Sequence, residues 1–211
     1  MKEDSLALKV YVEIRRKILS SQIAAGVRLK ENDWAKKLDV NRMAVREALT
    51  RLLGEGLVES GKKGGYFVTT LTADDVMEIK ELREILELGA LKLAFQKIKQ
   101  KDIELLELIS EDFTIMVQKG YLEGACEADV KFHETLISCA YNKKLVDIYQ
   151  LSNIPLFHQK LGKTQVKLTD YEETDIEHRK LVKAIKEKNF KLAKETLLKH
   201  LHRGAETVIE P

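Results

Sequence analysis

The stretch NDWAKKLDVNRMAVREALTRL, from Asn32 to Leu52, contains two short helical patterns separated by a break at Asp39. Ala35 precedes Val45 by ten residues, a spacing at which a small residue on one helix and a branched residue on the next let the two helices cross closely around a turn. Asp adopts the left-handed backbone of such a turn more readily than most residues. The stretch therefore predicts a helix-turn-helix.

The flanking sequence predicts the rest of a small N-terminal domain. Apolar residues recur every four positions in the first 20 residues, which predicts a leading helix (Leu6, Val10, Ile14 and Ile18). Two helices follow over about 31–38 and 42–53, and Asn41 is a strong N-cap for the second. The segments LVES and YFVTT then predict two short strands around the basic tip GKKGG. This order is typical of a winged helix-turn-helix.

From Thr72 onward the sequence predicts only helices. Thr72 is suited to an N-cap, and two aspartates in the first turn favour a helix that continues to about Ile98. Further helices are predicted over about 101–118, 121–140, 143–161, 170–188 and 190–208, with a kink at Pro155. The expected fold class is mainly α, with an N-terminal winged helix-turn-helix over residues 1–70 and a C-terminal antiparallel all-helical bundle over residues 71–211.

Charge is distributed unevenly along the 211 residues. The first 70 residues carry 14 Lys and Arg against 9 Asp and Glu, whereas residues 71–211 carry 22 against 25. A basic first third suggests a polyanion as partner for that part alone, although charge runs are usually solvated faces. No signal peptide or membrane-spanning apolar run is recognisable, and the two cysteines form no CxxC pair. These features predict a cytoplasmic protein without a membrane partner.

The second helix of the motif has one apolar and one polar side. Stepping 100° per residue places Val45, Ala48, Leu49 and Leu52 on one side, and Met43, Arg46, Glu47 and Thr50 on the other. The N-terminal end of such a helix enters the major groove, where Arg42 and Arg46 could bind guanine edges or phosphates. Arg51 lies nearer the back, so it meets either the DNA backbone or an acidic neighbour. The base sequence that the helix reads stays undetermined.

The segment LKENDWAKKLDVNRMAVREALTRLLGEGLVESGKKGGYFV resembles the winged-helix domain of GntR-type bacterial transcription regulators. The resemblance covers about 60 residues, and VREAL followed by EGLV is specific to that family. It implies that Arg42 and Arg46 contact operator DNA while the wing tip (Lys62, Lys63 and Gly64) follows the adjacent groove or backbone. The chain departs from the family pattern at the turn, where Asp39 replaces Gly, and at Asn32, where some members have Arg.

The second half contains a candidate metal site. Asp129 and His133 stand four residues apart on one predicted helix, and two other helices carry His178 and His200. One carboxylate and three imidazoles suit a divalent ion such as Zn, Ni or Mn. Each histidine taken alone reads more readily as an ordinary core or surface residue. Cys126 is either a spare ligand or, more simply, a small buried thiol.

The helical half resembles the effector domain (FCD domain) of the FadR-type GntR subfamily. The segment LREILELGALKLA matches the opening of that domain, and the D-x-x-x-H, E-H and H-L motifs match its metal ligands. The resemblance implies that Arg83 faces the effector cavity and binds an anionic ligand; the alternative is an ion pair with Glu87. Tyr149 and Asn153 are further candidates for effector binding. His158 lies on the same predicted helix, but no feature of the sequence marks it as a site residue.

Together these features predict a ligand-responsive transcription regulator, with repression favoured by family precedent, and not an enzyme. It would bind double-stranded palindromic operator DNA as a homodimer, with a small carboxylate effector bound at the metal. One alternative is a metalloenzyme that uses the Asp/His₃ site, although no HExxH motif or nucleophile motif accompanies it. The other is an architectural DNA-binding protein that has no effector.

Overall fold

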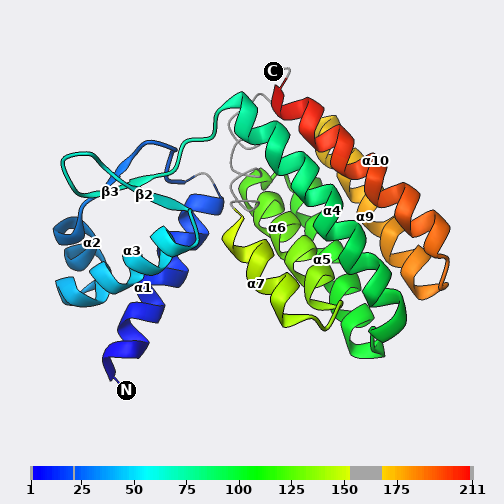
Figure 1. The fold of residues 1–211 in the computed structure, drawn as a ribbon, viewed down its shortest axis with the longest axis horizontal. Coiled ribbons are helices and arrows are strands. Elements are labelled where there is room, and N and C mark those ends of the chain that lie inside the picture. Colours follow the sequence, from blue (N-terminus) through cyan, green and yellow to red (C-terminus); the bar gives the residue numbers. More distant parts are fainter. Residues whose placement is uncertain (1, 21, 153–167, 210–211) are drawn as a thin grey trace.

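The computed structural model describes residues 2–20, 22–152 and 168–209, which form a small N-terminal domain and a larger helical domain joined by one connection (Figure 1). The N-terminal domain contains α1 (Lys2–Leu19), β1 (Arg28–Leu29), α2 (Glu31–Leu38), α3 (Arg42–Gly54), β2 (Val58–Ser60) and β3 (Tyr66–Val68). The helical domain contains α4 (Ala73–Lys97), α5 (Gln100–Gln118), α6 (Leu122–Ser138), α7 (Lys143–Leu151), α9 (Leu168–Lys186) and α10 (Phe190–Ile209). The mainly α fold class is thus confirmed.

The turn between α2 and α3 forms as the sequence predicts. Asp39 has a left-handed backbone with φ of 52°, and its N–H reaches the carbonyl of Ala35 at the end of α2. Asn41 caps α3, because its Oδ1 accepts a hydrogen bond of 2.8 Å from the N–H of Ala44. Val45 is fully buried beneath the crossing. These local contacts set the direction in which α3 leaves the turn.

Three strands form the sheet, in the order β1, β3, β2. The predicted hairpin is present, with Val58 opposite Val68 and Ser60 opposite Tyr66. The sequence pattern did not reveal β1, which pairs antiparallel with β3 through only two residues. Such a short strand has no periodicity of its own, so only its partner defines it. The addition of β1 places Arg28 beside the base of the wing.

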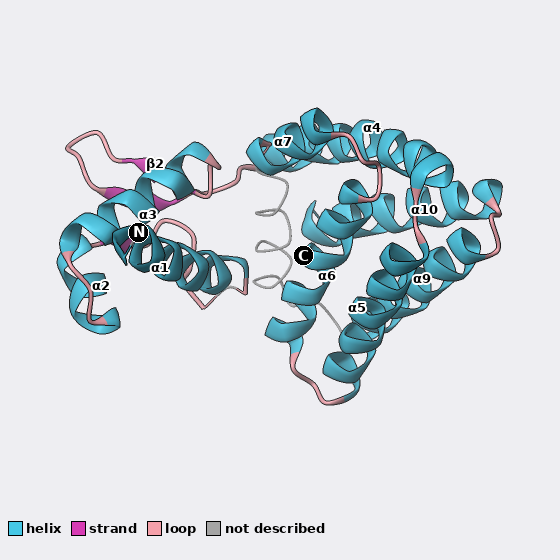
Figure 2. Cartoon of the chain, turned by 90° about the horizontal axis from the view of Figure 1, so that it is seen from below, coloured by secondary structure: helices cyan, strands magenta, loops and turns pink. Residues whose placement is uncertain are grey.

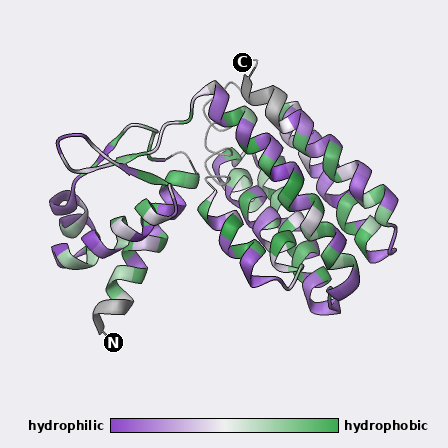
Figure 3. Cartoon of the chain, in the orientation of Figure 1, coloured by the Kyte–Doolittle hydropathy of each residue, from purple (hydrophilic) through white to green (hydrophobic). Residues whose placement is uncertain are grey.

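The helical domain is an antiparallel bundle (Figure 2) whose helices carry both hydrophobic and hydrophilic residues (Figure 3), and the buried apolar residues form clusters between the helices. Thr72 caps α4 in a reciprocal capping box with Asp75, as the aspartates of the first turn predict. The helix predicted over 143–161 ends earlier, at Leu151, followed by Ser152, whose hydroxyl donates to the carbonyl of Tyr149. The expected kink at Pro155 lies outside the described residues. In the described ranges, every helix is too short or too polar to cross a membrane.

Helix α6 is the element shared by the two domains. It packs against α4, α5 and α7 within the bundle and against α1 of the N-terminal domain. Val130 of α6 belongs to the same apolar cluster as Tyr11, Leu19 and Val45, which form part of the core of the N-terminal domain. The hydrophobic cores of the two domains therefore meet at this helix.

Candidate DNA-binding surface and metal site

The N-terminal half of α3 is exposed where a recognition helix must be. Arg42, Met43, Arg46, Glu47 and Thr50 are all exposed, whereas Val45, Ala48, Leu49 and Leu52 are buried, as the predicted division of the helix requires. Met43 is an apolar side chain that is 66% exposed, a large fraction for a residue whose only role is packing. The polar face of α3 is therefore available to a nucleic acid.

Glu31 at the start of α2 binds both arginines of this face. Its Oε2 accepts a hydrogen bond of 3.1 Å from Nη2 of Arg42, and its Oε1 accepts one of 2.9 Å from Nε of Arg46. Hydrogen bonds from Arg46 lower the pKa of Glu31 and so keep it ionised. One carboxylate thus orients both guanidinium groups that the sequence assigns to DNA.

The wing tip projects next to this surface (Figure 1). Lys62, Lys63 and Gly64 are exposed, and the positive φ of 79° at Gly64 and 93° at Gly65 requires glycine for the tight turn. At the base of the wing, the hydroxyl of Tyr66 lies 3.3 Å from Oγ1 of Thr50 on α3. The base of the wing therefore contacts the exposed face of α3.

Arg51 contacts an acidic neighbour, one of its two predicted partners. Its Nε lies 3.4 Å from Oε1 of Glu55, and its guanidinium stacks on the ring of Tyr11 at 3.8 Å. Tyr11 also donates a hydrogen bond of 2.7 Å to Glu55. Arg51 thus meets an acidic neighbour at the C-terminal end of α3, away from Arg42.

The structure brings together the four predicted metal ligands in the interior of the bundle. Asp129 and His133 come from α6, His178 from α9 and His200 from α10, and one donor atom of each lies within 4.8 Å of the others. Nε2 of His133 is 2.9 Å from Nε2 of His200, and Nε2 of His178 is 3.1 Å from Oδ1 of Asp129. Two donors that bind one ion at about 2.1 Å and at a right angle lie about 3.0 Å apart, so these separations fit a shared ion.

Two carboxylates outside the cluster orient two of the imidazoles. Oε2 of Glu87 lies 2.7 Å from Nδ1 of His133, and Oε2 of Glu177 lies 3.1 Å from Nδ1 of His200. An ionised carboxylate only accepts hydrogen bonds, so both Nδ1 atoms carry protons, and the two Nε2 atoms face each other. Across 2.9 Å the two Nε2 atoms either share one proton or, once that proton is released, both present lone pairs that a cation can bind.

Arginines hold both of these carboxylates. Arg83 donates from Nε to Oε1 of Glu87 at 2.7 Å, and Arg203 donates from Nη2 to Oε2 of Glu177 at 2.7 Å. Burial opposes ionisation of Glu87, but Arg83 and His133 outweigh it and lower the pKa of Glu87. For Glu177, burial is likewise outweighed by His200 and Arg203, and its pKa falls to about 2. Two Arg–Glu–His chains therefore end at the cluster, one through Glu87 and one through Glu177.

The pKa values of the three imidazoles are shifted in different directions. Burial lowers the pKa of His200 to about 3 and also lowers the pKa of His178. For His133, burial again favours the neutral ring, but the charge of Glu87 outweighs it and raises the pKa. His178 is held by aromatic rings, since Phe132 stacks on it at 4.0 Å and Phe113 meets it edge-on at 5.2 Å. Neutral His178 and His200 are in the form that binds metals.

The remaining predicted residues lie around this cluster. Arg83 is buried and paired with Glu87, which is the alternative to its predicted ligand-binding role. Tyr149 is buried, and its hydroxyl lies 3.3 Å from Glu87. Cys126 is buried against the hydroxyl of Tyr171, which fits its interpretation as a buried thiol, and burial raises its pKa to about 11. Asn153 and His158 lie outside the described residues.

Several important residues were not singled out from the sequence. Glu31, Glu177 and Arg203 each act through partners on another helix, so spacing along one helix could not reveal them. Arg28 lies at the base of the wing beside Gly65, and only the pairing of β1 with β3 brings it there. A residue whose partner is distant in sequence leaves no local pattern.

An exposed recognition helix beside a basic wing, joined to a helical domain with a buried Asp/His₃ cluster, defines a DNA-binding transcriptional regulator. Residues 6–68 match the family described as bacterial regulatory proteins, gntR family, and residues 78–203 match the FCD domain. The chain belongs to the GntR family and carries an FCD domain. It is a transcriptional regulator and not an enzyme, as predicted.

Similar proteins cover nearly the whole chain. The HTH-type transcriptional regulator YdhC of Bacillus subtilis is 28% identical over 94% of this chain and 89% of its own length. The gluconate operon transcriptional repressor of Bacillus licheniformis is 27% identical over 97% of this chain and 84% of its own length. The structure of McbR/YncC from E. coli superposes with a TM-score of 0.82, covering 93% of each chain at 20% identity. This last likeness establishes the shared fold.

Proposed function

We propose that this chain is a ligand-responsive repressor that binds palindromic operator DNA as a homodimer and uses a divalent metal ion to bind its effector. The observation that carries the metal site is the convergence of the Nε2 atoms of His133 and His200 at 2.9 Å in a cluster with Asp129 and His178. Asp129 and His178 complete a set of three nitrogen donors and one oxygen donor. Such a set suits Zn, Ni or Mn and leaves positions for ligand oxygens.

We assign DNA binding to residues 1–70, and metal binding, effector binding and dimerisation to residues 71–211. Arg42 and Arg46 would read base edges or phosphates. Met43, Glu47 and Thr50 would line the same groove, and Lys62, Lys63 and Gly64 would contact the adjacent groove or backbone. Two copies related by two-fold symmetry would place their recognition helices in successive major grooves. Sedimentation of the purified protein at several concentrations tests the dimer.

The effector is proposed to be a small carboxylate. When bound, the metal would act as a Lewis acid that receives carboxylate oxygens. Arg83 and Tyr149 would lie beside that ligand, since both contact Glu87 next to the cluster. One relative is named for the gluconate operon, and gluconate is a carboxylate. A thermal-shift screen of small carboxylates with and without metal tests this chemistry.

Elemental analysis tests the metal site directly. Wild-type protein loaded separately with Zn²⁺, Ni²⁺ or Mn²⁺ and then desalted should retain about one ion per chain. Asp129→Ala and His178→Ala should lose that ion. If the wild type retains none of the three, the cluster is not a metal site, and the remaining alternative is a DNA-binding protein whose helical domain has no metal-assisted effector.

Duplex selection from a random pool tests DNA binding. The wild type should enrich a palindrome, and replacing Arg42 and Arg46 together with Ala should abolish binding of that palindrome while the helical content is retained. Unchanged binding by the double variant would overturn the assignment of α3 as the recognition helix.

A further inference from the structure

Helix α6 contributes adjacent residues to two different sites. Asp129 and His133 belong to the metal cluster, whereas their next neighbours, Val130 and Glu134, contact the N-terminal domain. An α-helix turns about 100° per residue, so consecutive side chains point in different directions from one rigid rod. A shift or rotation of α6 that follows its metal ligands must therefore also move its contacts with the N-terminal domain.

The apolar part of that contact is Val130. It is only 4% exposed and belongs to one cluster with Tyr11 and Leu19 of α1. A buried apolar contact of this kind resists separation of the two helices, because separation would return that surface to water. Val130 therefore fixes the point about which α6 and α1 can move.

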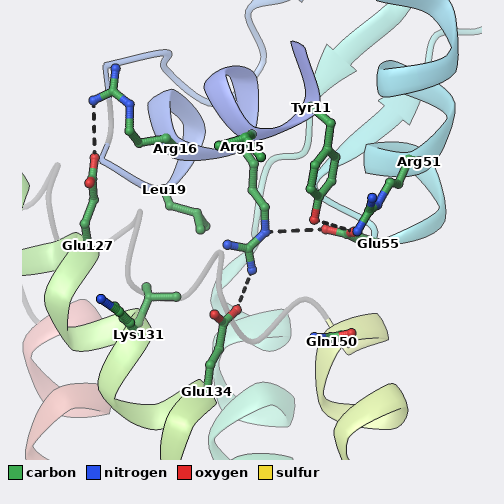
Figure 4. Close-up of a pocket in the computed structure, with 12 residues that line it drawn as sticks. Tyr11, Arg15, Arg16, Leu19, Arg51, Glu55, Glu127, Lys131, Glu134 and Gln150 are labelled. Atoms are coloured by element: carbon green, nitrogen blue, oxygen red, sulfur yellow. Dashed lines mark hydrogen bonds and ion pairs between the residues drawn. The ribbon is translucent and has the colours of Figure 1, made fainter. Parts of the chain in front are cut away.

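The polar part of the contact centres on Arg15 (Figure 4). One end of its guanidinium donates to Oε1 of Glu134, and its Nε lies 3.5 Å from Oε2 of Glu55. Glu55 is the C-cap of the recognition helix α3. A planar guanidinium can bind two carboxylates at once, which an ammonium group does less well. Arg15 thus links the neighbour of a metal ligand directly to the end of the helix proposed to read DNA.

Two further contacts extend the same face of α6 (Figure 4 shows the first). Arg16 lies 3.6 Å from Glu127, and the side-chain amide of Gln22 donates to Glu123 at 3.2 Å. Glu127 and Glu134 line a cleft of about 370 Å³ between the domains, whose wall also includes Lys131 and Gln150. Charged contacts beside such a cleft can be exchanged for water at small cost, unlike a sealed apolar interface.

We infer that α6 transmits the state of the metal site to the recognition helix through Arg15, which joins Glu134 on α6 to Glu55 at the end of α3. This inference rests on the proposed metal function and adds the route by which that site would control DNA binding. Val130 acts as the pivot, and Arg15 converts a displacement of α6 into a displacement of α3. Because the coupling is thermodynamic, DNA must change metal affinity by the same factor as metal changes DNA affinity.

The test compares DNA affinity of chelator-treated and Ni²⁺-loaded protein, with a duplex that the wild type has selected from a random pool. For the wild type, Ni²⁺ should change the dissociation constant of that duplex by at least about five-fold. Arg15→Ala and Glu134→Gln should each reduce the change to less than about two-fold while retaining wild-type affinity for Ni²⁺ in calorimetry. Glu134→Gln preserves the shape of the side chain. It therefore still provides the test if Arg15→Ala lowers the stability of the fold.

The matched control is Lys186→Ala, which breaks an ion pair of 2.6 Å between α9 and Glu107 of α5, remote from α1. This variant should keep the full response to Ni²⁺. If the wild type binds no metal, the proposed metal site and this inference both fail. If the wild type binds Ni²⁺ but its DNA affinity does not respond, or if Arg15→Ala and Glu134→Gln respond fully, this inference alone is overturned.

Discussion

Glu31 holds Arg46 through two hydrogen bonds, from Nε at 2.9 Å to Oε1 and from Nη2 at 3.2 Å to Oε2. Two parallel bonds fix the plane of the guanidinium, so Arg46 loses less conformational freedom when it meets a planar partner. The same carboxylate also binds Arg42. An acidic residue within a DNA-binding surface repels phosphates, yet here it orients the cations that attract them.

Glu31→Gln should therefore change specificity and affinity in opposite directions. Removal of one negative charge should strengthen binding to scrambled DNA, because non-specific affinity follows the charge near phosphates. Loss of orientation at Arg42 and Arg46 should reduce the ratio of specific to non-specific affinity by roughly ten-fold. Fluorescence anisotropy with selected and scrambled duplexes at two salt concentrations measures both quantities.

Asp33→Asn is the control for this prediction, since Asp33 lies in the same first turn of α2 and its replacement changes the net charge equally. Only the non-specific affinity should rise in this variant. An equal loss of specificity in the Glu31 and Asp33 variants would show that overall charge, and not the orientation of the two arginines, sets the ratio.

Glu177→Gln should weaken metal binding without removing a ligand. Glu177 holds Nδ1 of His200 at 3.1 Å, and the loss of such an outer-shell carboxylate typically lowers metal affinity by about 10- to 100-fold. Competition with a chromophoric chelator measures the affinity for Ni²⁺ or Zn²⁺.

Glu173→Gln, one turn away on α9 and half-exposed beside Lys199, should leave that affinity unchanged. Wild-type metal affinity in the Glu177 variant would contradict an orienting role for the carboxylate.

Glu87→Gln should destabilise the fold far more than the loss of an exposed ion pair. Glu87 is completely buried against Arg83, so neutralising it leaves an uncompensated buried charge, at a cost of about 3–5 kcal/mol in the free energy of unfolding. Asp147→Asn removes a pair of the same i, i+4 spacing with Lys143 on the surface and should cost less than about 0.5 kcal/mol. Urea unfolding of both variants measures the difference. Similar losses in the free energy of unfolding would refute this prediction.

Metal-free protein should lose stability as the pH falls through the range of histidine. Burial lowers the pKa of His200 to about 3, whereas an unfolded histidine titrates near about 6.5. Between these values the unfolded chain binds a proton that the folded chain does not, so the free energy of unfolding decreases as the pH falls, by up to about 1.4 kcal/mol per unit. His178, whose pKa is also lowered by burial, acts in the same direction.

Urea unfolding in the presence of a chelator, between about pH 7 and about pH 4.5, checks this dependence. His200→Gln should make the slope shallower, because one of the protons taken up on unfolding is removed. A slope equal to that of the wild type would mean that His200 is protonated in the folded protein.

Local sequence chemistry was sufficient to predict most of the fold. Asp39 and Asn41 act through their own backbone and the next turn, so the helix-turn-helix follows from a few neighbouring residues. Thr72 likewise marks the start of α4 through a capping box. The strand β1 was not predicted, because it depends on a partner strand that is distant in sequence. The end of α7 at Leu151 was not predicted either, because the helical pattern of the sequence continues beyond it.

The site could be predicted only as far as residue chemistry allows. Asp129 and His133 share one helix face, and the chemistry of histidine suggested the other two ligands, which the structure brings into one cluster. The carboxylates behind His133 and His200 depend on how helices pack, since Glu87 and Glu177 lie on α4 and α9. Charge pairs across domains, such as Arg15 with Glu134, are equally invisible along the chain.

The position of Val130 has a consequence for protein engineering. Because this residue of the helical domain completes the core of the N-terminal domain, the two halves are not interchangeable modules. A chimera that joins residues 1–70 to the helical domain of another regulator would place a foreign side chain against Tyr11 and Leu19. Hybrid sensors built on this scaffold need the facing surfaces of α1 and α6 to be transplanted together.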